Sequence, residues 1–216
     1  MEPQQMLIIG MIWVLNLAIS FWNARVVGLA WIEVNAVGGF RLFMAWMGGV
    51  MAAVGFSWSV LIFAAIGARQ LEYLSPEATK VSLELGYVIL IPFVLFSGYA
   101  ITLDSWAAAF RQGGWRNYGV SVYNTAATLH NTYEAYQSFG PALSSVVDYF
   151  TADGSSGSGS SRRKSDRDEK ATVILLVLLS CLAGVIITVA LIRSYAGSAA
   201  LAKPSRDEWD REGFAR

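Results

Sequence analysis

His130 and Glu134 are the side chains best spaced to act together as an acid and a base, because they lie one helical turn apart. Catalysis by this pair would also need a nucleophile in a recognisable motif or a second carboxylate at matched spacing, and the sequence has neither. The single cysteine, Cys181, lies within an apolar run, where a thiol is unreactive. We therefore predict that His130 forms hydrogen bonds within a packed aromatic face and that the chain is not an enzyme.

Metal and cofactor sites are also disfavoured by the composition. One histidine and one cysteine exclude a site built on two imidazoles, an internal disulfide framework and a cysteine-based zinc site. The chain contains no glycine-rich phosphate-binding motif, no zinc-protease motif and no calcium-binding loop. We expect neither a cofactor nor a metal ion.

Three polar side chains, Asn16, Ser20 and Asn23, share one face of an otherwise apolar segment. An unpaired polar group in hydrocarbon is costly, so these side chains need partners. They could line a polar path or a ligand site, or they could form hydrogen bonds between packed helices. We favour hydrogen bonding between helices, and the polar path is the basis of an alternative function.

The composition, which is apolar and poor in charge, indicates what kind of protein carries these side chains. Hydrophobic residues make up 55% of the 216 residues, charged residues make up 15%, and the mean hydropathy is +0.45. Soluble domains usually carry about 25% charged residues. Sixteen basic residues balance sixteen acidic ones, which argues against nucleic acid binding through a general basic surface. The composition predicts a membrane protein embedded in the lipid bilayer.

Four segments are apolar and long enough to cross a membrane as helices, which takes about 20 residues. We predict an all-α, multi-pass membrane protein with four transmembrane helices. The first helix is expected to be retained rather than cleaved as a signal peptide, because no basic residue precedes it. The predicted spans are 6–27, 40–68, 81–103 and 171–192.

Local signals mark where several helices begin, end or bend. The glycines at 38–39 predict a turn after the first helix. Ser75, Pro76 and Glu77 predict a helix start ahead of the third span, since they supply an N-cap, a proline at the first helical position and an acidic first turn. Further breaks are predicted at 113–114 and 140–141, and a kink is predicted at Pro92.

Small residues recur at helical spacing on the second and fourth spans. In lipid, such stripes let helices approach closely and associate through van der Waals contact. We predict that they pack helices within the chain, with contact between copies as the less favoured alternative. The residues are Gly48, Ala52, Gly55 and Ser59 on the second span, and Ser180, Gly184 and Thr188 on the fourth.

The segment 105–150 is rich in aromatic residues and is predicted to lie outside the membrane. Residues 120–137 can form a helix that carries Tyr123, His130 and Tyr133 on one face. A helix on a membrane surface usually has a polar face rich in lysine and arginine, which this one lacks. We therefore predict that its aromatic face docks on a partner protein.

The remaining segments are a linker and a tail. The tail carries Trp209 and Phe214, which are available for docking. Basic residues are absent before the first span and dense before the fourth, which favours a cytoplasmic location for the long loop 105–170. The predicted divisions are 1–104, a three-helix transmembrane region; 105–150, an aromatic extramembrane helical segment; 151–170, a flexible Gly/Ser and charged linker; 171–192, the fourth transmembrane helix; and 193–216, a polar tail.

Together these features predict a non-catalytic structural or accessory subunit of a larger membrane protein assembly, such as a component of a virion or organelle membrane. The expected partners are other membrane protein subunits or copies of the same chain, and not nucleic acid. The alternative is a small oligomeric channel or transporter with a polar path along the first transmembrane helix.

Overall fold

A computed structural model of the chain describes residues 3–37, 39–152 and 160–202, and the regular structure of these residues is entirely helical. The predicted all-α class is therefore confirmed for the described part of the chain. The helices are α1 (Pro3–Val37), α2 (Gly39–Gln70), α3 (Pro76–Gln112), α4 (Trp115–Thr151) and α5 (Ser160–Ala202).

Three of the helical segments are long and apolar enough to cross a membrane, namely Leu42–Gln70, Pro76–Gln112 and Arg167–Ser198. They correspond to the second, third and fourth predicted spans, and they indicate an integral membrane protein. The first predicted span falls in α1, where the apolar stretch found among the described residues is Trp13–Leu29. The described residues therefore do not confirm the count of four spans.

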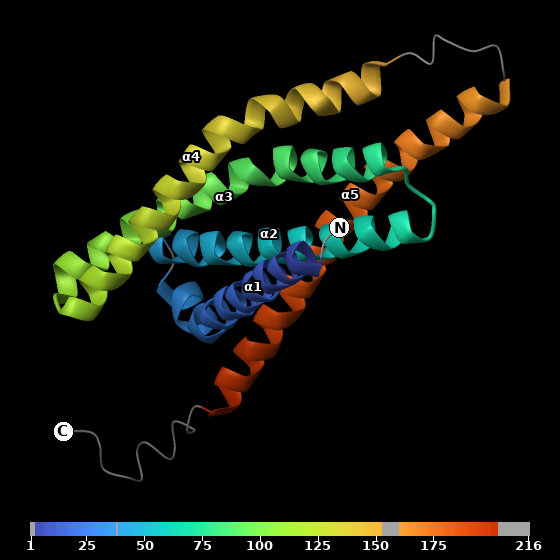
Figure 1. Ribbon diagram of the computed structural model, residues 1–216. Helices are drawn as coiled ribbons and strands as arrows, with labels where there is room; N and C mark the ends of the chain where they lie inside the picture. The colour runs from blue at the N-terminus through green and yellow to red at the C-terminus, as the bar shows by residue number, and fades with distance from the viewer. Residues whose placement is uncertain (1–2, 38, 153–159, 203–216) are drawn as a thin grey trace, which may run out of the picture.

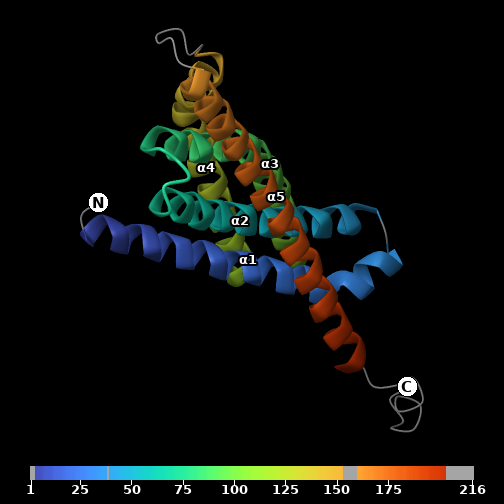
Figure 2. The same ribbon diagram turned by 90° about the vertical axis from the view of Figure 1, so that its right-hand side faces the viewer.

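Helices α3 and α4 form an antiparallel hairpin and run side by side in both views (Figures 1 and 2). Helix α2 packs on α3, and α1 packs on α2. Helix α5 crosses the others obliquely and contacts α1, α2 and α3 (Figure 1). Helix α4 lies at one edge of this arrangement, where its main neighbour is α3 (Figure 1).

Two of the predicted boundaries have clear geometric causes. Ser75 is the N-cap of α3, and its hydroxyl accepts a hydrogen bond from the backbone N–H of Ala78 at 3.1 Å. Gly113 and Gly114 separate α3 from α4 with φ angles of +64° and +87°, which side chains rarely allow. Helix α1 is described as far as Val37 and α2 from Gly39 onward, and Gly38, where the first turn is predicted, lies outside the described residues.

The break predicted at 140–141 is wrong, because α4 continues through Pro141 to Thr151. Gly140 and Pro141 are both exposed, and a Cβ added at Gly140 would meet no atom within 4 Å. On the opposite side, Ala142 and Val146 remain buried and continue the packing. Tertiary contact therefore offsets the roughly 3 kcal/mol that a proline costs inside a helix.

Two other segments are more helical than the sequence pattern predicts. Helix α3 extends past its predicted span to Gln112, and it is continuous through Pro92, where a kink is predicted. Helix α5 begins at Ser160, inside the segment expected to be a linker.

Helix α5 contributes to both of the hydrophobic clusters that hold the helices together. Near its start, Val173 packs with Val81 of α3 and Val146 of α4. Near its end, Ile187 and its neighbours pack against Ala52 and the adjoining buried residues of α1 and α2. The fourth predicted span thus bridges the α1–α2 pair and the α3–α4 hairpin.

Candidate functional site

The polar residues predicted in the first span lie at the contact between α1 and α2. The Asn16 side-chain amide donates to the Gly55 carbonyl oxygen at 2.9 Å and to Ser59 Oγ at 2.8 Å. The Ser20 hydroxyl is buried and donates to the Asn16 carbonyl oxygen at 2.7 Å. Asn23 is half-buried one turn further on. Both amide hydrogens of Asn16 are therefore bound within the chain rather than presented to a path.

Glycines of the small-residue sets predicted on the second and fourth spans lie at close contacts between helices. A Cβ on Gly184 of α5 would lie 2.5 Å from the backbone nitrogen of Ser57 and 2.7 Å from the carbonyl oxygen of Ala53, both on α2. A Cβ on Gly48 would lie 2.7 Å from Val27, and one on Gly55 would overlap the Ser20 hydroxyl. Buried positions among the predicted set are Ala52, Gly55, Ser59, Ser180, Gly184 and Thr188.

Gly28 of α1 lies at a third close contact that the sequence pattern did not single out. A Cβ there would lie 2.6 Å from Tyr195 Cβ and 2.9 Å from the Ile192 carbonyl oxygen of α5. The signal in the sequence is the spacing of four residues between Ala24 and Gly28, both buried, because a pair of small residues at this spacing lets two helices approach.

Hydroxyl and indole groups join α3 to α4 along the hairpin. Thr102 Oγ1 donates to the Asn124 carbonyl oxygen at 3.2 Å and lies 3.0 Å from Thr128 Oγ1. One turn nearer the connection, the Trp106 indole N–H donates to Thr125 Oγ1 at 2.9 Å. These contacts satisfy, within the chain, polar groups that would otherwise be costly in an apolar environment.

The side of α4 that faces α3 follows a seven-residue repeat. Such a repeat keeps one helix face in register with a neighbouring helix over many turns. The hydrogen-bonded contacts continue along it, with the Tyr99 hydroxyl 2.9 Å from Thr132 Oγ1. The buried residues that define the repeat are Ser121, Thr128, Ala135 and Ala142.

The side of α4 away from α3 carries two adjacent rows of exposed side chains. We call the first the apolar row, although Tyr136 also brings a hydroxyl; it consists of Val122, Leu129, Tyr136, Leu143 and Val147. We call the second the polar row; it consists of Tyr123, His130 and Tyr133, which were predicted to share one face, together with Ala126 and Gln137.

Two side chains of the polar row bond to each other within α4. Tyr133 is 58% exposed, and its hydroxyl accepts a hydrogen bond from the Gln137 side-chain amide one turn away. His130 is exposed rather than enclosed in a packed aromatic cluster. The described residues contain no group of three or more His, Cys, Asp or Glu side chains that could hold a metal ion. Trp209 and Phe214, the other predicted docking residues, lie outside the described residues.

Glu169 and Lys170 of α5 bond to the α2–α3 connection and to the end of α4, and we call these two residues the polar junction. From the sequence pattern they were predicted only to be part of a charged linker. The backbone N–H of Ser75, in the α2–α3 connection, donates to Glu169 Oε1 at 2.7 Å, and the Tyr149 hydroxyl of α4 donates to Oε2 at 3.5 Å. Lys170 Nζ donates to the Ala152 carbonyl oxygen at 3.0 Å. The junction fixes the start of α5 against the open end of the α3–α4 hairpin.

Comparison with known proteins gives no match to any family model, curated protein or solved structure. The three long apolar segments among the described residues indicate a helical integral membrane protein.

Proposed function

We propose that this chain is a non-catalytic structural or accessory subunit of a larger membrane protein assembly and that the polar row of α4 contacts the rest of that assembly. The observation that carries the proposal is the exposure of this row along an edge helix whose opposite face is already bound to α3. Tyrosine contributes a large, rigid contact area together with a hydrogen-bonding group, which suits protein interfaces.

The same proposal includes which helices cross the membrane and which side the basic run occupies. Helix α1 has 35 residues and would reach beyond the thickness of a bilayer at about 1.5 Å per residue. We propose that it crosses the membrane in addition to the three long apolar segments. The basic run 162–170 is assigned to the cytoplasmic side, following the bias of lysine and arginine toward that side.

The alternative, a small oligomeric channel or transporter, places a polar path along α1. It has weaker support, because Asn16 and Ser20 direct their hydrogen-bond donors to groups within the chain. A channel would require these groups to face water or a permeating ion.

The test is native mass spectrometry of the chain purified in mild detergent from its natural membrane. We expect a complex with other membrane subunits that is lost in Tyr133→Ala and retained in Tyr136→Ala, a matched tyrosine in the apolar row. A chain that remains a single copy would contradict the proposal. A homo-oligomer that conducts ions, with conduction lost in Asn16→Ala, would support the channel instead.

A further inference from the structure

The register of the α3–α4 hairpin sets the depth of α4 in the membrane. Thr102, at one end of the apolar part of α3, contacts Thr128 of α4. At the other end, Val81 packs in one cluster with Val146. Residues of α4 between about 125 and 147 therefore lie beside the apolar part of α3. If α3 crosses the bilayer, this part of α4 occupies the same depth.

Helix α5 supports the same depth. In the same cluster Val146 packs with Val173, close to the beginning of the long apolar segment Arg167–Ser198 of α5. The polar junction at Glu169 and Lys170 lies one turn earlier on α5, as expected at the edge of a hydrocarbon layer. One boundary of the membrane should therefore pass close to Val146 and Tyr149.

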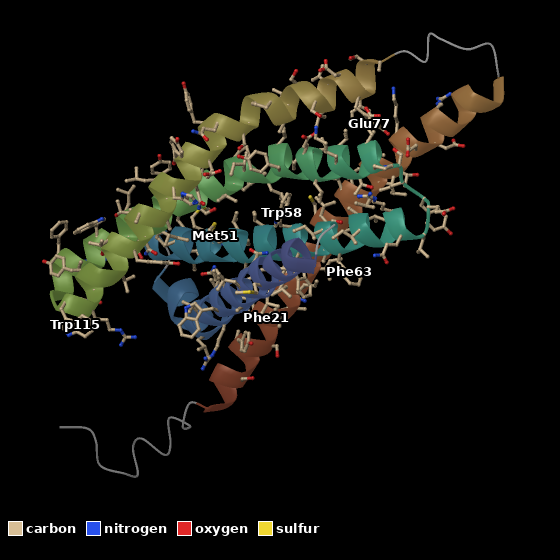
Figure 3. The ribbon with its side chains drawn as sticks, viewed as in Figure 1. Phe21, Met51, Trp58, Phe63, Glu77 and Trp115 are labelled. Atoms are coloured by element: carbon tan, nitrogen blue, oxygen red, sulfur yellow. The ribbon has the colours of Figure 1, made fainter. Side chains whose placement is uncertain are left out.

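The two ends of the hairpin have the character of membrane interfaces. Trp115 lies at one end and Glu77 at the other (Figure 3). Near Trp115, the rings of Trp106, Phe110 and Tyr118 pack on one another, and aromatic side chains gather at the level of lipid headgroups. Between Arg116 and Asp148 the sequence of α4 contains one formally charged residue, Glu134.

The apolar row supplies the surface that lipid contact requires. Leu129 is 59% exposed, and the row continues at seven-residue intervals from Val122 to Leu143. In water this row would be an uncovered hydrophobic stripe on a long edge helix, whereas acyl chains cover it without cost. The polar row beside it has the opposite requirement, because its hydrogen-bonding groups need polar partners at that depth.

We propose that α4 crosses the membrane as a further transmembrane helix and that its polar row pairs with the polar row of a second copy of this chain in the same orientation. The choice of a second copy follows from chemistry. Tyrosine, histidine and glutamine are each both donor and acceptor, so identical side chains can bond to one another across a two-fold axis. The inference rests on the proposed function, which makes the polar row an interface, and it names the partner.

The spacing of the polar row suits a helical partner. Ala126 and Tyr133 lie seven residues apart, and so do His130 and Gln137, which is the repeat of two helices packed at about 20°. Gly119 and Gly140 continue the row at each end, and a Cβ at either position would meet no atom within 4 Å. Their surroundings are open to the backbone of a second helix.

Disulfide cross-linking in membrane vesicles tests the pairing. In a Cys181→Ser background, Ala126→Cys is compared with Leu129→Cys, and Gly119→Cys with Val122→Cys, after oxidation with copper phenanthroline. These changes leave Tyr133 in place. A disulfide needs the two Cβ atoms within about 4 Å, so we expect dimers from positions 119 and 126 and no dimer band from positions 122 and 129. All four positions are exposed, and equal helix content by circular dichroism verifies folding.

Equal cross-linking at all four positions, or none at 119 and 126, would overturn the pairing. If cross-linking fails while a complex with a different protein still depends on Tyr133, this inference falls and the proposed function stands. If no complex of any kind forms, both fail. Labelling of a cysteine at position 126 by a membrane-impermeant maleimide in intact vesicles, at the rate of a cysteine placed at exposed Trp115, would place α4 outside the membrane and also overturn the inference.

Discussion

Replacing Gly184 by alanine should separate α5 from α2 and destabilise the fold. The added Cβ would lie 2.5 Å from the Ser57 nitrogen and 2.7 Å from the Ala53 carbonyl oxygen, whereas non-bonded contacts need about 3.5 Å. Both atoms belong to the backbone of a helix, so they can move only if the helices move apart by about 1 Å.

The magnitude follows from two opposing effects. Overpacking of this kind costs about 1–3 kcal/mol, and alanine recovers up to about 1 kcal/mol through its higher helix propensity. The net loss should be about 1–2 kcal/mol, equivalent to a fall of roughly 2–8 °C in the melting temperature of a protein of this size. Thermal unfolding in mild detergent, followed by circular dichroism, measures it.

Gly197 provides a matched control on the same helix. It is exposed, and a Cβ there would meet no atom within 4 Å, so Gly197→Ala should unfold at or above the wild-type temperature. Gly55→Ala should give a smaller loss than Gly184→Ala, because the group nearest its Cβ is the rotatable hydroxyl of Ser20. Equal melting temperatures for the Gly184 and Gly197 variants would refute the close α2–α5 contact.

Three further predictions concern hydrogen bonds. Asn16→Ala should lower the free energy of unfolding by about 1 kcal/mol, since two bonds of about 0.6 kcal/mol each are lost; an unchanged melting temperature would argue against this contact. Ser75→Ala should cost about 1 kcal/mol and Ser75→Asp much less, because only aspartate retains a cap, and equal losses would contradict the cap. Thr102→Val and Thr128→Val should show a coupling of about 0.6 kcal/mol in a double-mutant cycle. Additive losses would contradict a direct contact between the two hydroxyl groups.

The features predicted correctly from the sequence depend on neighbouring residues. Ser75 caps α3 through a bond to a residue three positions away, and Gly113 turns the chain through its own backbone angle. Hydropathy likewise identified the three long apolar segments, because the hydropathy of a segment depends only on its own residues.

The features that were missed depend on contacts between distant segments. Helix α4 continues through Pro141 while Ala142 and Val146 remain packed on its opposite side, and the local sequence does not show that contact. The bond from Ser75 to Glu169 joins residues that are 94 positions apart. The position of α4 beside α3 was missed because threonine and tyrosine lower the hydropathy of α4, whereas their hydroxyl groups bond to α3.

The collision accessibility of a spin label at position 129 tests the membrane placement of α4 most directly. The label is attached to Leu129→Cys in the Cys181→Ser chain, reconstituted in a lipid bilayer. Oxygen concentrates in hydrocarbon, and a charged nickel chelate remains in water. Because Leu129 lies in the apolar row, between the depths of Thr128 and Val146, we predict high accessibility to oxygen and low accessibility to nickel. High accessibility to nickel and low accessibility to oxygen would contradict the account.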